Sequence, residues 1–77
     1  MNLYLISQTE NSNYDTFDSA VVAAPDEAAA RSINPGGPAR WGDRCWCASP
    51  EAVTVRWIGV AADGIEPKVL LASFNAG

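Results

Sequence analysis

The segment from Asn34 to Pro50, NPGGPARWGDRCWCASP, separates two stretches of regular pattern and determines how the chain is organised. Its Pro-Gly-Gly-Pro tract fits neither a helix interior nor a central strand, so the segment predicts a loop. Connections longer than about 12 residues are uncommon in compact domains and are usually functional or disordered. This loop holds two of the three tryptophans, both cysteines and two of the five basic residues, whereas disordered segments are poor in aromatics. It either binds a partner or folds back to cap a small core.

On both sides of the loop, apolar periodicity predicts short strands and one short helix. Two strands flank a polar turn rich in Asn, Asp and Ser, which predicts a hairpin. A proline followed by two acids and three alanines predicts a helix of about two turns, ended by the Asn34-Pro35 pair. The predicted elements are a strand over 1–8, a turn over 9–16, a strand over 17–24, a helix over 25–33, and strands over 53–62 and 68–74.

These elements predict an α+β fold, a small ββαββ domain with a four-stranded, mainly antiparallel sheet, one short helix and the long Trp/Arg/Gly loop. The strands over 1–8 and 68–74 are apolar on both faces, so we expect them at the centre of the sheet. We expect Leu70→Ala to cost about 2 to 5 kcal/mol, as for a buried leucine. The side chains that we expect to be largely buried are Leu5, Val21, Val55, Trp57, Leu70 and Leu71.

Length and charge narrow the possible classes of protein. We expect a single domain over residues 1–77, with a core small enough that a homo-oligomer would help to stabilise it. The net charge of −4 argues against direct nucleic-acid binding, which depends on clustered Lys and Arg. The chain has no apolar run of about 20 residues and its N-terminus lacks the pattern of a signal peptide, so we expect a cytoplasmic protein without a membrane partner.

The inventory of reactive side chains is small. There is no histidine, which removes the commonest general base and metal ligand. Cys45 and Cys47 form one Cys-X-Cys pair without the second pair that a tetrahedral zinc site needs. Their spacing is also too short for an unstrained disulfide. We therefore expect two reduced thiols, no metal, no cofactor and no enzymatic activity.

The candidate ligand or partner site is Arg40, Trp41, Arg44 and Trp46 in the loop. A guanidinium can hold a phosphate through two hydrogen bonds while an indole stacks on a base. The two pairs of an arginine with a nearby tryptophan therefore suit a nucleotide-like ligand or an acidic protein surface. Alternatively, the rings cover the sheet and the arginines pair with Asp43 or Glu51.

The tip of the first hairpin supplies two further candidate residues, Tyr14 and Asp15. We expect both to reach the loop site. A carboxylate at this position could accept hydrogen bonds from ribose hydroxyls, although turn formation alone also explains an Asp there.

Four segments, MNLYLISQ, YDTFDSAVVAAPDE, SPEAVTVRWIGVA and VLLASFNAG, resemble a group of short accessory proteins encoded by tailed phages and prophages. The resemblance spans most of the chain but not the loop, and it brings no catalytic residues. It implies a phage protein that acts in the cytoplasm of the infected bacterial host. Small proteins of this kind often counter host defences.

Two functions follow as expectations. The first is a non-enzymatic counter-defence binding protein that sequesters a nucleotide-type immune signal or binds a host defence protein. The alternative is a small structural or protein-interaction domain without a small-molecule ligand. A small enzyme ranks last, because the sequence offers no pairing of a base with a nucleophile.

Overall fold

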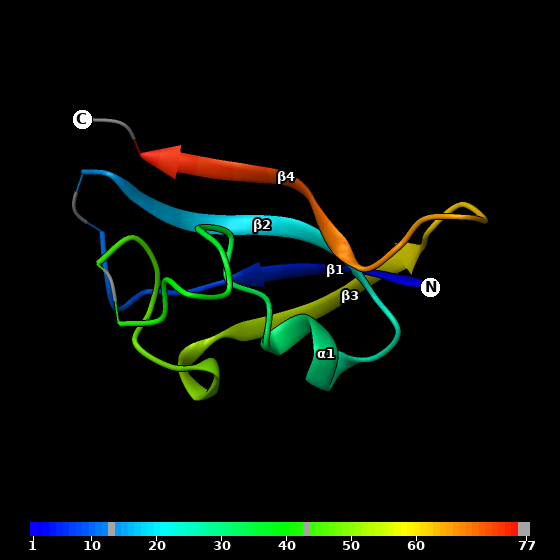
Figure 1. Cartoon of the computed structure of the whole chain (residues 1–77), viewed down its shortest axis with the longest axis horizontal. Coiled ribbons are helices and arrows are strands. Elements are labelled where there is room, and N and C mark those ends of the chain that lie inside the picture. Colours follow the sequence, from blue (N-terminus) through cyan, green and yellow to red (C-terminus); the bar gives the residue numbers. More distant parts are fainter. Residues whose placement is uncertain (13, 43, 76–77) are drawn as a thin grey trace.

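A computed structural model describes residues 1–12, 14–42 and 44–75. It contains a four-stranded antiparallel sheet and one short α-helix, so the predicted α+β class and the ββαββ order are confirmed (Figure 1). A short 3-10 helix, which the sequence did not predict, precedes the third strand. The elements are β1 Asn2–Ser7, β2 Thr16–Ala24, α1 Glu27–Arg31, the 3-10 helix Pro50–Ala52, β3 Thr54–Val60 and β4 Lys68–Asn75.

The strand order is β3-β1-β2-β4, and each neighbouring pair is antiparallel. The expectation that β1 and β4 are both central is therefore half wrong, since β4 is an edge strand and β2 is central. Two apolar faces on β4 suggested burial on both sides, but the alanines and valines of β2 occupy that position instead. The connection from β3 to β4 crosses from one edge of the sheet to the other at the end where β1 begins (Figure 1).

One face of the sheet forms the core. Tyr4 and Ile6 of β1 lie opposite Val22 and Ala20 of β2, and all four side chains are buried. Because successive side chains of a strand point to opposite faces, these residues share one face. Helix α1 and the loop before the 3-10 helix cover this face (Figure 1). The opposite face carries the alternate residues, beginning with Leu3, Leu5 and Val21.

The prediction of buried residues is wrong for three of its six members, Trp57, Leu70 and Leu71. Leu71 is 71% exposed, Trp57 is 58% exposed and Leu70 is 41% exposed, while Leu5, Val21 and Val55 are half-buried. Leu70 and Leu71 belong to the edge strand β4, and Trp57 belongs to the other edge strand, β3. The buried apolar residues are Tyr4, Ile6, Ala20, Val22, Ala23, Ala24, Ala30, Cys45, Trp46, Cys47 and Val53.

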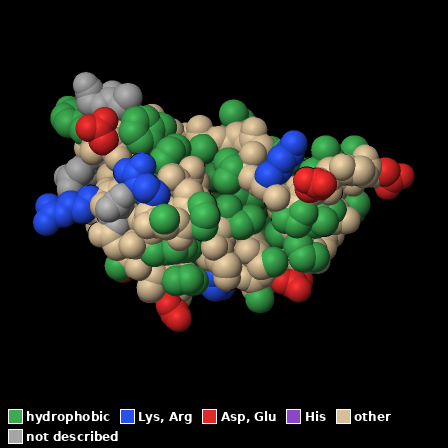
Figure 2. All heavy atoms as spheres, in the orientation of Figure 1, with side chains coloured by type: hydrophobic (Ala, Val, Ile, Leu, Met, Phe, Trp, Pro, Cys, Tyr) green, Lys and Arg blue, Asp and Glu red, His purple; other side chains and the backbone are tan. Residues whose placement is uncertain are grey.

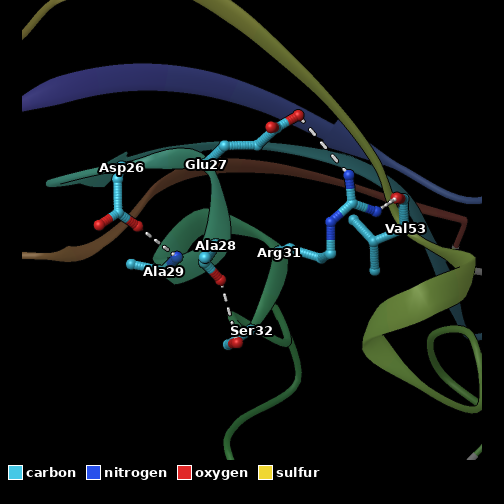
Figure 3. Close-up of polar contacts among 7 residues, drawn as sticks. All are labelled: Asp26, Glu27, Ala28, Ala29, Arg31, Ser32 and Val53. Carbon is cyan, nitrogen blue, oxygen red and sulfur yellow. Dashed lines mark hydrogen bonds and ion pairs between the residues drawn. The ribbon is translucent and has the colours of Figure 1, made fainter.

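Helix α1 is shorter than predicted, and its end contacts explain its bounds (Figure 3). Asp26 is the N-cap, and its carboxylate accepts a hydrogen bond from the Ala29 backbone N–H at 2.8 Å. The Ser32 hydroxyl donates to the Ala28 carbonyl at 3.1 Å at the other end. Arg31 pairs with Glu27 at 3.6 Å and also donates to the Val53 carbonyl, which joins the helix to the start of β3.

Within the described residues, the helices are all too short and too polar to cross a bilayer.

Candidate functional site

The second half of the loop belongs to the core. Trp46 is the largest fully buried side chain, with 0% of its surface exposed, and Cys45 and Cys47 on either side of it are buried too. These three residues pack in one cluster with the sheet residues of the core face. Of the two interpretations of the loop tryptophans, the structure therefore supports for Trp46 the one in which the ring covers the sheet. A ligand can stack on Trp46 only if the loop opens.

Three hydrogen bonds fasten this part of the loop to the first hairpin. The Phe17 N–H donates to the Cys45 carbonyl at 2.7 Å. The Asn11 side-chain amide donates to the Trp46 carbonyl at 2.7 Å, and the Ala48 N–H donates to a Glu10 carboxylate oxygen at 2.9 Å. The loop and the β1–β2 connection consequently lie side by side at one end of the molecule (Figure 1).

Gln8 organises the β1–β2 connection, a role that the sequence analysis missed. Its buried side-chain amide donates to the carbonyls of Asn11 at 2.8 Å and Phe17 at 2.9 Å. Its amide oxygen accepts from the Asn11 N–H at 2.9 Å. A polar residue directly after an apolar strand is a weak signal for such a role. Gln8 thus holds two of the three residues that bind the loop, Asn11 and Phe17.

The first half of the loop turns tightly before it reaches the arginines. The Gly37 N–H donates to the Asn34 carbonyl at 2.9 Å, and the Arg40 N–H donates to the Gly37 carbonyl at 3.1 Å. Gly36 packs so closely on Cys45 that a Cβ atom at this position would lie 2.8 Å from Sγ. Gly37 has a φ of +117°, which L-residues rarely adopt. The Gly-Gly pair therefore allows the loop to pack on its own second half.

The loop presents Arg40, Trp41 and Arg44 between these two halves. Both arginines are exposed, whereas Trp41 is half-buried and packs against the core. Arg40 has an interaction partner, and no hydrogen bond or ion pair joins Arg44 to any residue that the structure describes. In Figure 2, Lys and Arg side chains project at the end of the molecule where Figure 1 places the loop.

The carboxylates expected to pair with the arginines are Asp43 and Glu51. Asp43 lies outside the described residues. The pKa of the Glu51 carboxyl is lowered by a hydrogen bond from its own backbone N–H and by the Ser49 side chain, and Arg31 adds a small attraction. Glu51 therefore has its partners within the 3-10 helix and its N-cap, namely its own backbone N–H and Ser49.

Tyr14 and Asp15 lie at the same end of the molecule as the loop and are exposed. Asp15 has a φ of 63°, and its N–H donates to the Asn75 carbonyl at 2.5 Å, which ties the turn to the end of β4. The hydrogen bond from Phe17 to Cys45 limits the distance between the Cα atoms of Asp15 and Arg44 to less than about 18 Å by standard backbone dimensions. The structure thus brings the turn and the arginines to one end, while Trp46 lies inside.

The two thiols are buried and free. Burial raises the pKa of the Cys47 thiol, and the negative charge of Glu10 raises it further, so Cys47 is a poor nucleophile at neutral pH. Within the described part of the chain, His, Cys, Asp and Glu side chains form no cluster of three that could hold a metal ion. The charged groups that the described part of the loop exposes are the guanidinium groups of Arg40 and Arg44.

Two hollows are found elsewhere on the surface, and neither includes Arg40, Trp41 or Arg44. A cleft of about 360 Å³ runs between the start of the loop and the start of β4; it is lined by Ser32, Ile33, Asn34, Pro35, Gly37, Pro38, Pro67, Lys68 and Val69. A hollow of about 190 Å³ lies on the face of the sheet opposite α1; it is lined by Leu5, Ser19, Ala20, Val21, Leu71, Ala72 and Ser73.

Comparisons of the chain with protein-family models, with curated proteins and with solved structures found no match.

Proposed function

We propose that the chain is a non-enzymatic counter-defence binding protein of a phage, which acts in the cytoplasm of the infected bacterium. Arg40, Trp41 and Arg44 contact an anionic group of its target, and Tyr14 and Asp15 border the site. The observation that carries this proposal is the exposed Arg44 guanidinium, which has no partner among the described residues, on a loop anchored by a fully buried tryptophan.

The anchoring matters because binding is stronger when the contact residues need no ordering. Each flexible side chain that is immobilised on binding costs about 0.5 to 1.5 kcal/mol, and ordering a loop adds to that cost. Here Cys45, Trp46 and Ala48 are held by the hydrogen bonds to the first hairpin. The backbone of Arg44 is consequently fixed next to Cys45 before any target arrives.

The shape of the basic end favours an acidic protein surface over a nucleotide as the target. Sites for small molecules are concave and enclose most of the ligand, whereas the two hollows described above do not include the arginines. Exposed arginines beside a half-buried tryptophan are typical of protein interfaces. A nucleotide signal remains within the proposal, because guanidinium groups bind phosphate as well as carboxylate.

A thermal-shift screen with cyclic and ADP-ribose-type nucleotides tests the nucleotide form of the proposal. A ligand at one hundred times its Kd stabilises the folded state by about 2.7 kcal/mol. A nucleotide that raises the Tm of the wild type but not of Arg44→Ala or Arg40→Ala would identify the signal. Arg56→Ala removes another exposed arginine, from β3, and serves as the matched control.

Phage infection tests the proposal for both kinds of target. Bacteria that carry one defence system each would express the wild type, Arg44→Ala or Arg56→Ala, and plaques would be counted. We expect the wild type and Arg56→Ala to restore plaques under at least one system, and Arg44→Ala to lose this effect while its Tm stays within a few degrees of the wild type. If the wild type restores plaques under no system and no nucleotide shifts its Tm, the proposal is wrong.

The alternative, a protein-interaction domain without a small-molecule ligand, is favoured by a different observation. The sheet face opposite α1 exposes apolar side chains such as Leu71, and its hollow of about 190 Å³ is smaller than the roughly 300 to 1,000 Å³ of typical ligand pockets. Restoration of plaques by Arg40→Ala and Arg44→Ala to the level of the wild type would favour this function.

A further inference from the structure

The face of the sheet opposite α1 is apolar at its centre, and the loop and helix cover only the other face. The strand registers place Leu3, Leu5 and Ser7 of β1 beside Ala23, Val21 and Ser19 of β2. Leu71 and Ser73 of β4 continue these rows, since they lie opposite Val21 and Ser19. Ala23 is fully buried. We name the surface formed by the other residues of these rows, Leu3, Leu5, Ser7, Ser19, Val21, Leu71 and Ser73, the open face.

The open face has a projection next to a hollow. Leu71 projects from it with 71% of its surface exposed. The adjoining hollow of about 190 Å³ is bordered by Leu5, Val21 and Leu71 on one side and by the small Ser19 and Ser73 on the other. This volume is enough for an aliphatic side chain to enter. A surface that carries both a projection and a hollow can be complementary to itself.

We propose that the open face binds the open face of a second copy of this chain, with Leu71 of each copy in the hollow of the other. In a twofold dimer the same patch meets itself, so each projection must find a hollow on the same patch. Sheets that pack face to face lie about 10 Å apart with their side chains interdigitated, which is the arrangement that Leu71 and the hollow allow.

Charge is compatible with a second copy as the occupant. Two chains with a net charge of −4 repel each other at long range, so their contact must exclude acids. The side chains that border the hollow are all neutral. The neighbouring charges are two bases and one acid. Arg56 lies opposite Leu5 and Lys68 lies opposite Ala23, while the Asp18 carboxylate accepts a hydrogen bond from the Ser19 hydroxyl at 3.0 Å. The open face therefore brings no surplus of negative charge to the contact.

The size of the open face predicts how strongly the copies bind. Three strands about 4.8 Å apart and about six residues long span an area on the order of 300 Å². Two such faces bury on the order of 600 Å², below the range of about 1,200 to 2,000 Å² for stable complexes. Yet a patch of about 300 Å² is at the lower end of the range of the largest patches on monomers, which are often functional. We therefore expect a weak dimer that forms as the protein concentration rises.

Sedimentation velocity of the full chain, from micromolar to millimolar concentration, tests the dimer. We expect the wild type to shift from monomer to dimer across this range, and Leu71→Asp to raise the dissociation constant at least tenfold. Val60→Asp is the matched control, because Val60 is 69% exposed but lies on the helix side of the sheet. It pairs with Asn2, and the Asn2 side-chain amide donates to the Tyr4 hydroxyl and the Pro25 carbonyl on that side. Val60→Asp should associate like the wild type.

Ser19→Gln separates face-to-face packing from pairing of the β4 edges. The longer side chain fills the hollow from the central strand β2 and leaves the β4 backbone unchanged, so it should weaken the dimer as Leu71→Asp does. It also decides the question if Leu71→Asp fails to fold by circular dichroism. A wild type that stays monomeric up to millimolar concentration would overturn the proposal, and so would a Ser19→Gln variant that dimerises like the wild type.

Discussion

Substitution of Trp46 by alanine should remove most of the stability of the domain. Trp46 is fully buried within the core cluster, and replacing a buried Phe or Trp by Ala costs about 3 to 5 kcal/mol through lost burial and the cavity left behind. A domain of this length is stable by about 4 to 12 kcal/mol, at 0.05 to 0.15 kcal/mol per residue. Since 1 kcal/mol corresponds to about 4 to 8 °C in Tm for a domain of this size, the Tm should fall by at least about 12 °C.

Trp57→Ala is the matched control, because it removes the same side chain from a position that is 58% exposed. The indole N–H of Trp57 donates to the Asn2 side-chain oxygen at 3.3 Å, and the net contribution of such a hydrogen bond is about 0.5 to 1.5 kcal/mol. We expect Trp57→Ala to lower the free energy of unfolding by about 1 kcal/mol.

Trp46→Phe refines the prediction. The indole N–H of Trp46 is buried without a hydrogen-bond partner in the described structure, and an unsatisfied buried group costs about 1 to 3 kcal/mol. Phenylalanine removes this cost while it leaves a smaller cavity than alanine does, so it should destabilise far less than Trp46→Ala. Urea unfolding followed by far-UV circular dichroism measures all three variants. A Trp46→Ala variant that loses less than about 1 kcal/mol, or no more than Trp57→Ala, would refute the position of Trp46 in the core.

Three further predictions concern packing and titration. Gly36→Ala should cost about 1 to 3 kcal/mol by overpacking against Cys45, and the double variant with Cys45→Ala should recover part of this loss in urea unfolding. Leu70→Ala should cost roughly 1 kcal/mol in the same assay, below the 2 to 5 kcal/mol expected from sequence, because Leu70 is 41% exposed at an edge. The pKa of the Cys47 thiol is raised, so above the ordinary thiol value of 9.0 the folded state keeps a proton that the unfolded state loses. The free energy of unfolding should therefore fall as the pH rises past 9.0. Thermal unfolding at a series of pH values measures this fall, which should be smaller in Cys47→Ala.

The strands and the helix were predictable because their signals are local. Alternation over residues 53–62 predicted β3, and the run of acids and alanines after Pro25 predicted α1. The order of strands was not predictable in the same way. A strand that is apolar on both faces is typical of the sheet centre, but β4 has this pattern at an edge, where Leu71 projects from the open face. The alternation of residues along a strand shows how polar each of its two faces is, but it does not show which other part of the protein covers each face.

In the loop, too, the features set by nearby residues were predictable from the sequence, and the contacts with distant residues were not. Its composition predicted an ordered loop, and the sequence left open whether its tryptophans bind a ligand or cover the sheet. Trp46 lies between two apolar cysteines and is fully buried, whereas Trp41 follows Arg40 and is half-buried. The Cys-Trp-Cys triplet is the signal that distinguishes them. Sequence alone could not supply the hydrogen bonds from Asn11 and Phe17, which depend on a hairpin far away in the chain.

The arrangement of the loop separates the residues that stabilise the domain from those proposed to bind its target. Trp46 is in the core, while Arg44, two residues earlier, is exposed and has no partner among the described residues. A variant of Trp46 that loses binding would be uninformative about the site, because unfolding explains the loss as well. Exposed arginines without a partner contribute little to stability, since even exposed ion pairs contribute about 0 to 1 kcal/mol. A loss of plaques with Arg44→Ala at unchanged Tm would therefore assign binding to the guanidinium itself.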